Sequence, residues 1–172
     1  SSFVVVIAFP FISLVYEWNM SWTIPGEFGA WATAQEEQLK VITEFLLKMD
    51  NFGDFLFTFL VIAVIAGIGE ELLFRGLIQT YLGFAIKNQH LVIWITAIFF
   101  GVFHLQFYGV VPRILLGAIM GYLFYWSGSI KYSMFAHVTN NGFQVIASYL
   151  MVLNGESINV DEEVSFPIYI SI

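Results

Sequence analysis

The sequence predicts an all-α fold, a polytopic bundle of transmembrane helices that forms one membrane domain over residues 1–172. Hydrophobic residues make up 59% of the chain and charged residues 11%, whereas a soluble domain carries roughly 25% charged residues. Mean hydropathy is +0.81. The apolar residues occur in long runs, and only seven charged residues lie between Asn51 and Gly155. This length and pattern predict about five or six spans.

The first 50 residues predict one span and one surface helix. Residues 1–16 are an uncharged apolar run that contains a proline, and we expect a partial or short span there. The run begins without methionine, so we expect further spans upstream in a longer protein. Residues 26–50 mix charged residues with apolar ones at helical spacing, which is typical of an amphipathic helix at the membrane interface. Residues 154–172 form a polar tail.

Residues 51–153 predict the helix core that carries the candidate site. Four apolar runs in this region are suited to crossing a bilayer: 55–69, 91–106, 114–130 and 132–154. Gly67 and Gly69 predict a break or bend, after which a second helix begins at Glu70. Gly117 and Gly121 are four residues apart, a spacing of small residues that allows two helices to approach closely.

Three of the seven core charges lie close together, as Glu70, Glu71 and Arg75. Ionisable groups are costly in hydrocarbon, so their clustering indicates a functional site. Glu71 and Arg75 are four residues apart and can form an ion pair on one helix face, while Glu70 points elsewhere. The structural alternative is an interfacial salt bridge, with the acids stabilised by the helix dipole.

Two further core segments carry polar side chains. His104 shares a helix face with Phe100, and His137 shares one with Asn141. Each could be a packing residue or an interhelical hydrogen-bonding group. None has an evident local partner, so we expect these groups and Glu70 to converge on one polar cavity. Glutamate, two histidines and an asparagine could supply a base, a second proton carrier and oxyanion donors for hydrolysis.

These residues form three ordered motifs, EExxxR at Glu70, FxxxH at Phe100 and HxxxN at His137. Together they resemble the CAAX protease and bacteriocin-processing family, also called CPBP or Abi, whose members include the type II CAAX prenyl endopeptidases. The resemblance covers about residues 51–153. It implies an intramembrane endopeptidase that acts on a peptide or protein substrate within or at the membrane.

The resemblance also implies a role for each motif residue. Glu70 would activate water together with His104, and His137 and Asn141 would stabilise the tetrahedral oxyanion. The remaining pair of the first motif, Glu71 and Arg75, would be supporting residues. Prenylated proteins, bacteriocin-related peptides and other membrane peptides all remain open as substrates.

This mechanism could run with or without a metal ion. Glu70, His104 and His137 could together hold zinc, because three protein ligands and a water make a catalytic zinc site. A glutamate that binds the metal is then not free to act as the base. The chain has no cysteine and no His-Glu-x-x-His motif. We therefore expect metal-free glutamate chemistry without a cofactor, with zinc as the alternative.

Other classes of function remain as alternatives. Buried glutamate and histidine also build proton relays in transporters, and an immunity protein could bind its target without cutting it. The chain has no basic patch for nucleic acid, so the expected partners are the lipid bilayer and a membrane peptide. The short loops indicate a multi-pass protein of the bacterial inner membrane.

Overall fold

The computed structural model describes residues 2–155, which are helical apart from short connections. No strand occurs among them, so the predicted all-α fold is confirmed. The helices are α1 (Ser2–Met20), α2 (Gly26–Leu47), a long central helix over residues 52–85, α6 (Gln89–Phe103), α7 (Val110–Ser127) and α8 (Ile130–Leu153). A short 3₁₀ turn, η3 (Phe107–Gly109), precedes α7. The predicted tail lies outside the described residues from position 156 on.

The central helix joins five consecutive segments without interruption. They are α3 (Phe52–Thr58), η1 (Phe59–Ala66), α4 (Gly67–Glu71), η2 (Leu72–Gln79) and α5 (Thr80–Ala85), of which η1 and η2 have π-helical geometry. The predicted break at Gly67 and Gly69 is therefore wrong. A Cβ at Gly67 would lie 3.4 Å from the backbone nitrogen of Val138. The absence of a side chain at Gly67 therefore allows α8 to approach the central helix closely.

Three helical segments are long and apolar enough to cross a membrane: Phe3–Met20, Phe52–Ala85 and Phe107–Ser127. The helix Gln89–Phe103 is apolar but shorter. Within residues 2–155 this is fewer than the five or six predicted spans, and the first extends beyond the expected 1–16. The helix α8 is long but less apolar, because its buried face carries polar residues: Ser133, His137, Asn140, Asn141, Gln144 and Ser148.

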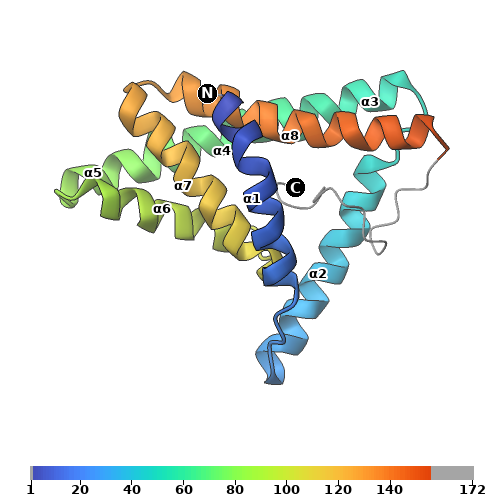
Figure 1. The fold of residues 1–172 in the computed structure, drawn as a ribbon, viewed down its shortest axis with the longest axis horizontal. Helices are drawn as coiled ribbons and strands as arrows, with labels where there is room; N and C mark the ends of the chain where they lie inside the picture. Colours follow the sequence, from blue (N-terminus) through green and yellow to red (C-terminus); the bar gives the residue numbers. More distant parts are fainter. Residues whose placement is uncertain (1, 156–172) are drawn as a thin grey trace.

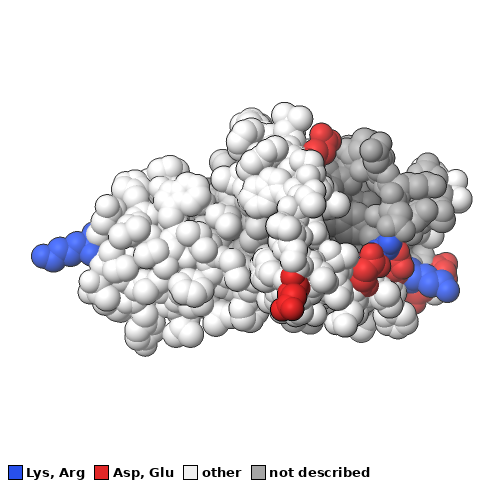
Figure 2. All heavy atoms as spheres, turned by 90° about the horizontal axis from the view of Figure 1, so that it is seen from below, with Lys and Arg blue, Asp and Glu red and all other residues white. Residues whose placement is uncertain are grey.

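The other helices are arranged around the central helix and α8 (Figure 1). The central helix lies alongside α8, with contacts from α3, η1 and α4. The α6–α7 hairpin packs beside them, α1 crosses α7 and α8, and α2 extends away from the bundle. Seen from below, most of the surface is formed by uncharged side chains; basic side chains lie near the two ends, and acidic ones lie near one end and toward the middle (Figure 2). A surface of this kind suits a protein embedded in lipid.

Glycines allow the two helices of the α6–α7 hairpin to touch. A Cβ at Gly101 would lie 2.5 Å from Ile114 Cγ1 and 3.0 Å from the Val110 carbonyl oxygen. A Cβ at Gly117 would lie 3.1 Å from the Phe100 ring. Gly121 meets α6 in the same way, so the predicted close approach at these small residues is confirmed.

This packing predicts opposite outcomes for two alanine substitutions. Gly101→Ala should lower stability by about 1–3 kcal/mol, because the added methyl overfills the contact with α7. Gly69→Ala is the control, since nothing lies within 4 Å of its Cβ position. That change should be neutral or stabilising, because alanine favours a helix over glycine. Thermal unfolding in detergent measures both, and equal effects would contradict the described α6–α7 contact.

Candidate active site

Three predicted residues from three separate elements meet at one point. Glu70 lies on α4, His104 follows the end of α6, and His137 lies on α8. Glu70 Oε2 is 3.7 Å from the Nε2 atom of each imidazole. The side chain of Glu70 is 26% exposed, whereas those of His104 and His137 are 12% and 3% exposed. The structure thus brings together a carboxyl group and two imidazoles in a mostly buried position.

Hydrogen bonds fix the orientation of both imidazoles. His104 Nδ1 lies 2.7 Å from the Phe100 carbonyl oxygen, and His137 Nδ1 lies 2.8 Å from Glu71 Oε1. Carbonyl and carboxylate oxygens only accept hydrogen bonds, so each Nδ1 carries the proton. In the neutral imidazoles, Nε2 then presents its lone pair. Both Nε2 atoms face Glu70, and the cluster is therefore rich in proton acceptors.

The predicted pair of Glu71 and Arg75 is confirmed as a buried ion pair. Arg75 Nη1 donates to Glu71 Oε1 at 2.8 Å, and both side chains are fully buried. The same oxygen accepts from His137, so the pair sets the position of that imidazole. Arg75 Nη2 also donates to the Gly117 carbonyl on α7 at 2.6 Å. One guanidinium thus connects the central helix to α7 and, through Glu71, to α8.

Asn141 lies one turn after His137 on α8, but its hydrogen bonds go elsewhere. Its Nδ2 donates to the Ile62 carbonyl at 3.1 Å, and its Oδ1 accepts from Asn140 at 3.3 Å. The side chain is 1% exposed. Asn141 therefore anchors α8 to the central helix, and its oxyanion role stays a prediction.

A cavity of about 320 Å³ opens beside Glu70 and His104. Its other lining residues are mostly apolar: Leu39, Gly69, Leu73, Phe74, Phe103 and Gln106. We call this cavity the catalytic cleft, after the roles predicted for Glu70 and His104. Apolar walls around a carboxyl and an imidazole suit a hydrophobic peptide segment whose backbone is presented to the polar groups.

The chain turns sharply where α6 ends, and this turn positions the cleft residues. Leu105 has a φ of 56°, the left-handed conformation that residues with a side chain rarely adopt. It separates His104 from Gln106, and both of these line the cleft. Sequence reasoning missed Gln106 and Leu39 because neither is charged nor belongs to a recognisable motif.

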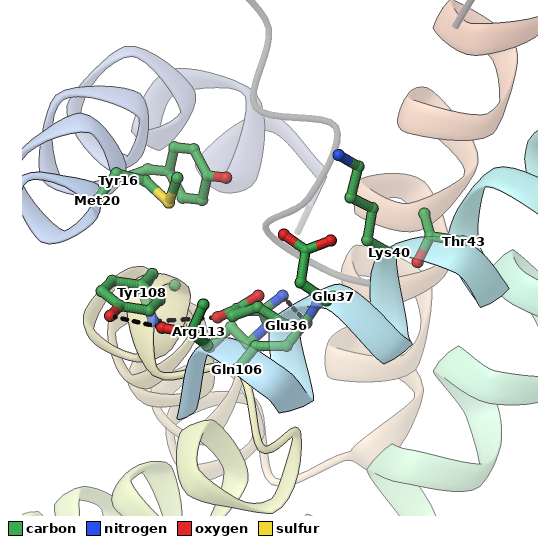
Figure 3. A pocket seen from close by; sticks show the side chains of 11 residues that line it. Tyr16, Met20, Glu36, Glu37, Lys40, Thr43, Gln106, Tyr108 and Arg113 are labelled. Atoms are coloured by element: carbon green, nitrogen blue, oxygen red, sulfur yellow. Dashed lines mark hydrogen bonds between the residues drawn. The ribbon is translucent and has the colours of Figure 1, made fainter. Parts of the chain in front are cut away.

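A second cavity, of about 230 Å³, lies between α1, α2, η3 and α7 (Figure 3). Gln106 lines this cavity as well as the catalytic cleft. Arg113, which is 1% exposed, also lines it. Arg113 is a charged residue in an apolar segment close to the second motif, but it was not predicted as a site residue.

No group of three or more His, Asp or Glu side chains between residues 2 and 155 has an arrangement that could hold a metal ion. The alternative zinc ligands Glu70, His104 and His137 nonetheless approach one another, with 3.7 Å between Glu70 Oε2 and each Nε2 atom, so metal-free chemistry stays a prediction.

Comparison with known proteins identifies one family. A family model described as type II CAAX prenyl endopeptidase Rce1-like matches residues 52–143, just over half of the chain. The matched region contains the central helix, α6, α7 and the part of α8 that carries His137 and Asn141. No curated protein and no solved structure matches the chain.

The buried ion pair predicts that Arg75 is essential to folding. Arg75→Ala leaves Glu71 as an uncompensated buried charge, which should cost about 3–5 kcal/mol. Lys87→Ala is the control, because it removes a cation from the exposed end of the same helical region. We expect the first variant to express poorly or to unfold at lower temperature in detergent, and the control to behave as wild type. A wild-type unfolding midpoint for Arg75→Ala would show that the pair does not support the fold.

Proposed function

Because the chain belongs to the Rce1-like family of type II CAAX prenyl endopeptidases, we propose that it is an intramembrane endopeptidase of the CPBP type. Its substrate would be a protein or peptide held within or at the membrane. The observation that carries this proposal is the approach of Glu70 to two imidazole Nε2 atoms at the edge of an apolar cleft. Carboxyl and imidazole groups in such an arrangement can exchange protons with a bound water.

In the proposed first step, water binds between Glu70 Oε2 and His104 Nε2. A water about 2.8 Å from Glu70 Oε2 can also lie within hydrogen-bond reach of His104 Nε2. Glu70 takes a proton from this water, with His104 orienting it, and the oxygen forms a bond with the substrate carbonyl carbon. The carbon–nitrogen bond then breaks, and Glu70 returns the proton to the leaving amine.

The oxyanion that forms in this step needs hydrogen-bond donors. His137 can donate from Nε2 once that atom is protonated, and the contact between its Nδ1 and Glu71 Oε1 holds the ring in place. Asn141 has two amide protons, one of which is used by the Ile62 carbonyl. We propose that its second proton contributes to the same oxyanion site, after a small adjustment of α8.

The proposed setting is the bacterial inner membrane. Three apolar helices and the family assignment fit an integral membrane protein. Leu39, Leu73 and Phe103 give the cleft apolar walls, which favours hydrophobic residues next to the cleaved bond. We leave prenylated proteins and bacteriocin-related peptides as candidates within this class.

The mechanism predicts that Glu70 is indispensable for turnover. Glu70→Gln keeps the shape of the side chain but cannot accept the proton, so activity should fall by about 10²–10⁴-fold. Glu27→Gln makes the same chemical change on the exposed start of α2 and should have no effect. The assay is cleavage of membrane-anchored reporter peptides by purified protein in liposomes, read by mass spectrometry.

Two results would change the proposed function. Full activity in Glu70→Gln would remove the proposed base. Absence of cleavage across the reporter set by correctly folded wild type would favour the alternative, an immunity or transport protein that binds without turnover. His137→Ala and Asn141→Ala should each lower activity by roughly 10²–10³-fold if they supply oxyanion donors.

Metal independence is a separate prediction. A strong zinc chelator should leave peptide cleavage almost unchanged, because the proposed base and donors are all side chains. Elemental analysis of the purified protein supplies the control. One zinc per chain that is lost in His104→Ala, together with activity restored only by added zinc, would replace this mechanism with the metal-dependent one.

A further inference from the structure

The turn that follows His104 is held by two helices outside the region that matches the family. This turn is η3, and two residues, Leu105 and Gln106, separate it from His104. Leu105 has the left-handed backbone conformation described above. Such a conformation is unfavourable for a residue with a side chain and persists only where surrounding contacts impose it. The contacts that reach η3 from α1 and α2 therefore bear on the position of His104.

Asn19, near the end of α1, bridges η3 with its amide group. Its Nδ2 donates to the Phe107 carbonyl at 3.2 Å, and its Oδ1 accepts from the Val111 N–H at 2.8 Å. The first N–H groups of a helix have no partner within it, and Gly109, which precedes α7, has no side chain that could cap it. Asn19 thus supplies from another helix the cap that α7 lacks. The Asn19 side chain is fully buried, so bulk water does not compete for these bonds.

The helix α2 holds the same turn through a carboxyl group and two aromatic rings. Glu36 Oε1 accepts from the Tyr108 backbone N–H at 3.1 Å (Figure 3). Burial raises the pKa of Glu36, and the bond from Tyr108 opposes that shift by stabilising the carboxylate. The ring centroids of Phe28 and Trp31 lie 5.1 and 5.4 Å from that of Phe107. The first two residues of η3 are therefore both in contact with α2.

We propose that Asn19 and Glu36 are positioning residues for His104. By fixing η3 they hold the turn at Leu105, and this turn keeps His104 Nε2 at 3.7 Å from Glu70 Oε2. Neither Asn19 nor Glu36 lines the catalytic cleft, so their effect on the reaction passes through the backbone of η3. This inference rests on the proposed peptidase function and extends the groups that support it into α1 and α2.

Chemical modification of the histidines tests this positioning without requiring turnover. Diethyl pyrocarbonate acylates the unprotonated nitrogen of an accessible imidazole, and mass spectrometry reads each histidine separately. The chain has three histidines. His90 is exposed, and His137 is held through its Nδ1 atom by Glu71, so these two serve as internal references for His104.

Two alanine substitutions should expose His104 selectively. In the wild-type protein in lipid nanodiscs, His104 should react slowly, because its side chain is 12% exposed. Asn19→Ala and Glu36→Ala should each raise the rate at His104 severalfold, since the turn that follows it is released. The rates at His90 and His137 should stay as in the wild-type protein.

Peptide cleavage separates positioning from substrate binding. Both alanine variants should lower kcat by about 10–100-fold, because a small displacement of a catalytic group is costly. They should leave KM nearly unchanged, since neither residue lines the cleft. Glu36→Gln keeps an oxygen that can accept from Tyr108, so it should restore most of the wild-type kcat. The matched controls are Glu37→Ala on α2 and Ser21→Ala just after α1; both residues are exposed, and both variants should behave as wild type.

Several results would contradict the positioning role. Wild-type reactivity at His104, or wild-type kcat, in both alanine variants would overturn it. A parallel rise at His104 and His137 with a lowered unfolding midpoint would do the same, because that pattern indicates a general loosening of the fold. If Asn19→Ala does not fold, equal reactivity at His104 in Glu36→Ala and Glu36→Gln rejects the inference. If the wild-type protein cleaves no peptide, the proposed function fails, while the histidine reactivities still decide whether α1 and α2 hold His104 in place.

Discussion

The buried pair of Glu71 and Arg75 is the interaction on which the site depends. Burying two charges is costly, and that cost is offset only where geometry and further hydrogen bonds are favourable. Here one Glu71 oxygen accepts from both Arg75 and His137, and Arg75 also reaches the Gly117 carbonyl. The guanidinium lies 5.0 Å from the centre of the Phe100 ring, which adds α6 to the connected elements. Four helical elements are thus held in register by one ion pair.

A second hydrogen bond between the central helix and α7 lies one turn further along both helices. Gln79 Nε2 donates to the Gly121 carbonyl at 3.2 Å, four residues after the contact between Arg75 and Gly117. A Cβ at Gly121 would lie 3.0 Å from Gln79 Oε1, so glycine there leaves room for this side chain of the central helix, whereas a Cβ at Gly117 would meet Phe100 and Ala97 of α6. In hydrocarbon such bonds satisfy groups that would otherwise be costly. The small-residue spacing in α7 therefore serves polar contacts as well as helix packing.

The sequence was sufficient to predict features that rest on local chemistry. Costly charges in an apolar segment predicted the Glu71–Arg75 pair and the convergence of Glu70 with both histidines, because few other partners exist in hydrocarbon. Sequence patterns could not reveal that the central helix continues through Gly67 and Gly69, since continuity depends on the packing of α8. The left-handed backbone conformation of Leu105 could not be predicted from the sequence either, because leucine rarely adopts it and only the tertiary structure imposes it. The environment of Gln106 follows from that turn.

The division of the chain between catalytic groups and cavity walls has a consequence for how the protein could diversify. Glu70, His104 and His137 lie within the region that matches the family, residues 52–143. Leu39, on the cleft wall, and Tyr16 and Glu36, in the second cavity, come from α1 and α2, outside that region. The groups proposed to handle protons thus lie inside the family region, whereas part of the wall of each cavity comes from outside it. Under the proposed function, replacing the two N-terminal helices would change part of the cavity walls without altering the groups proposed to handle protons.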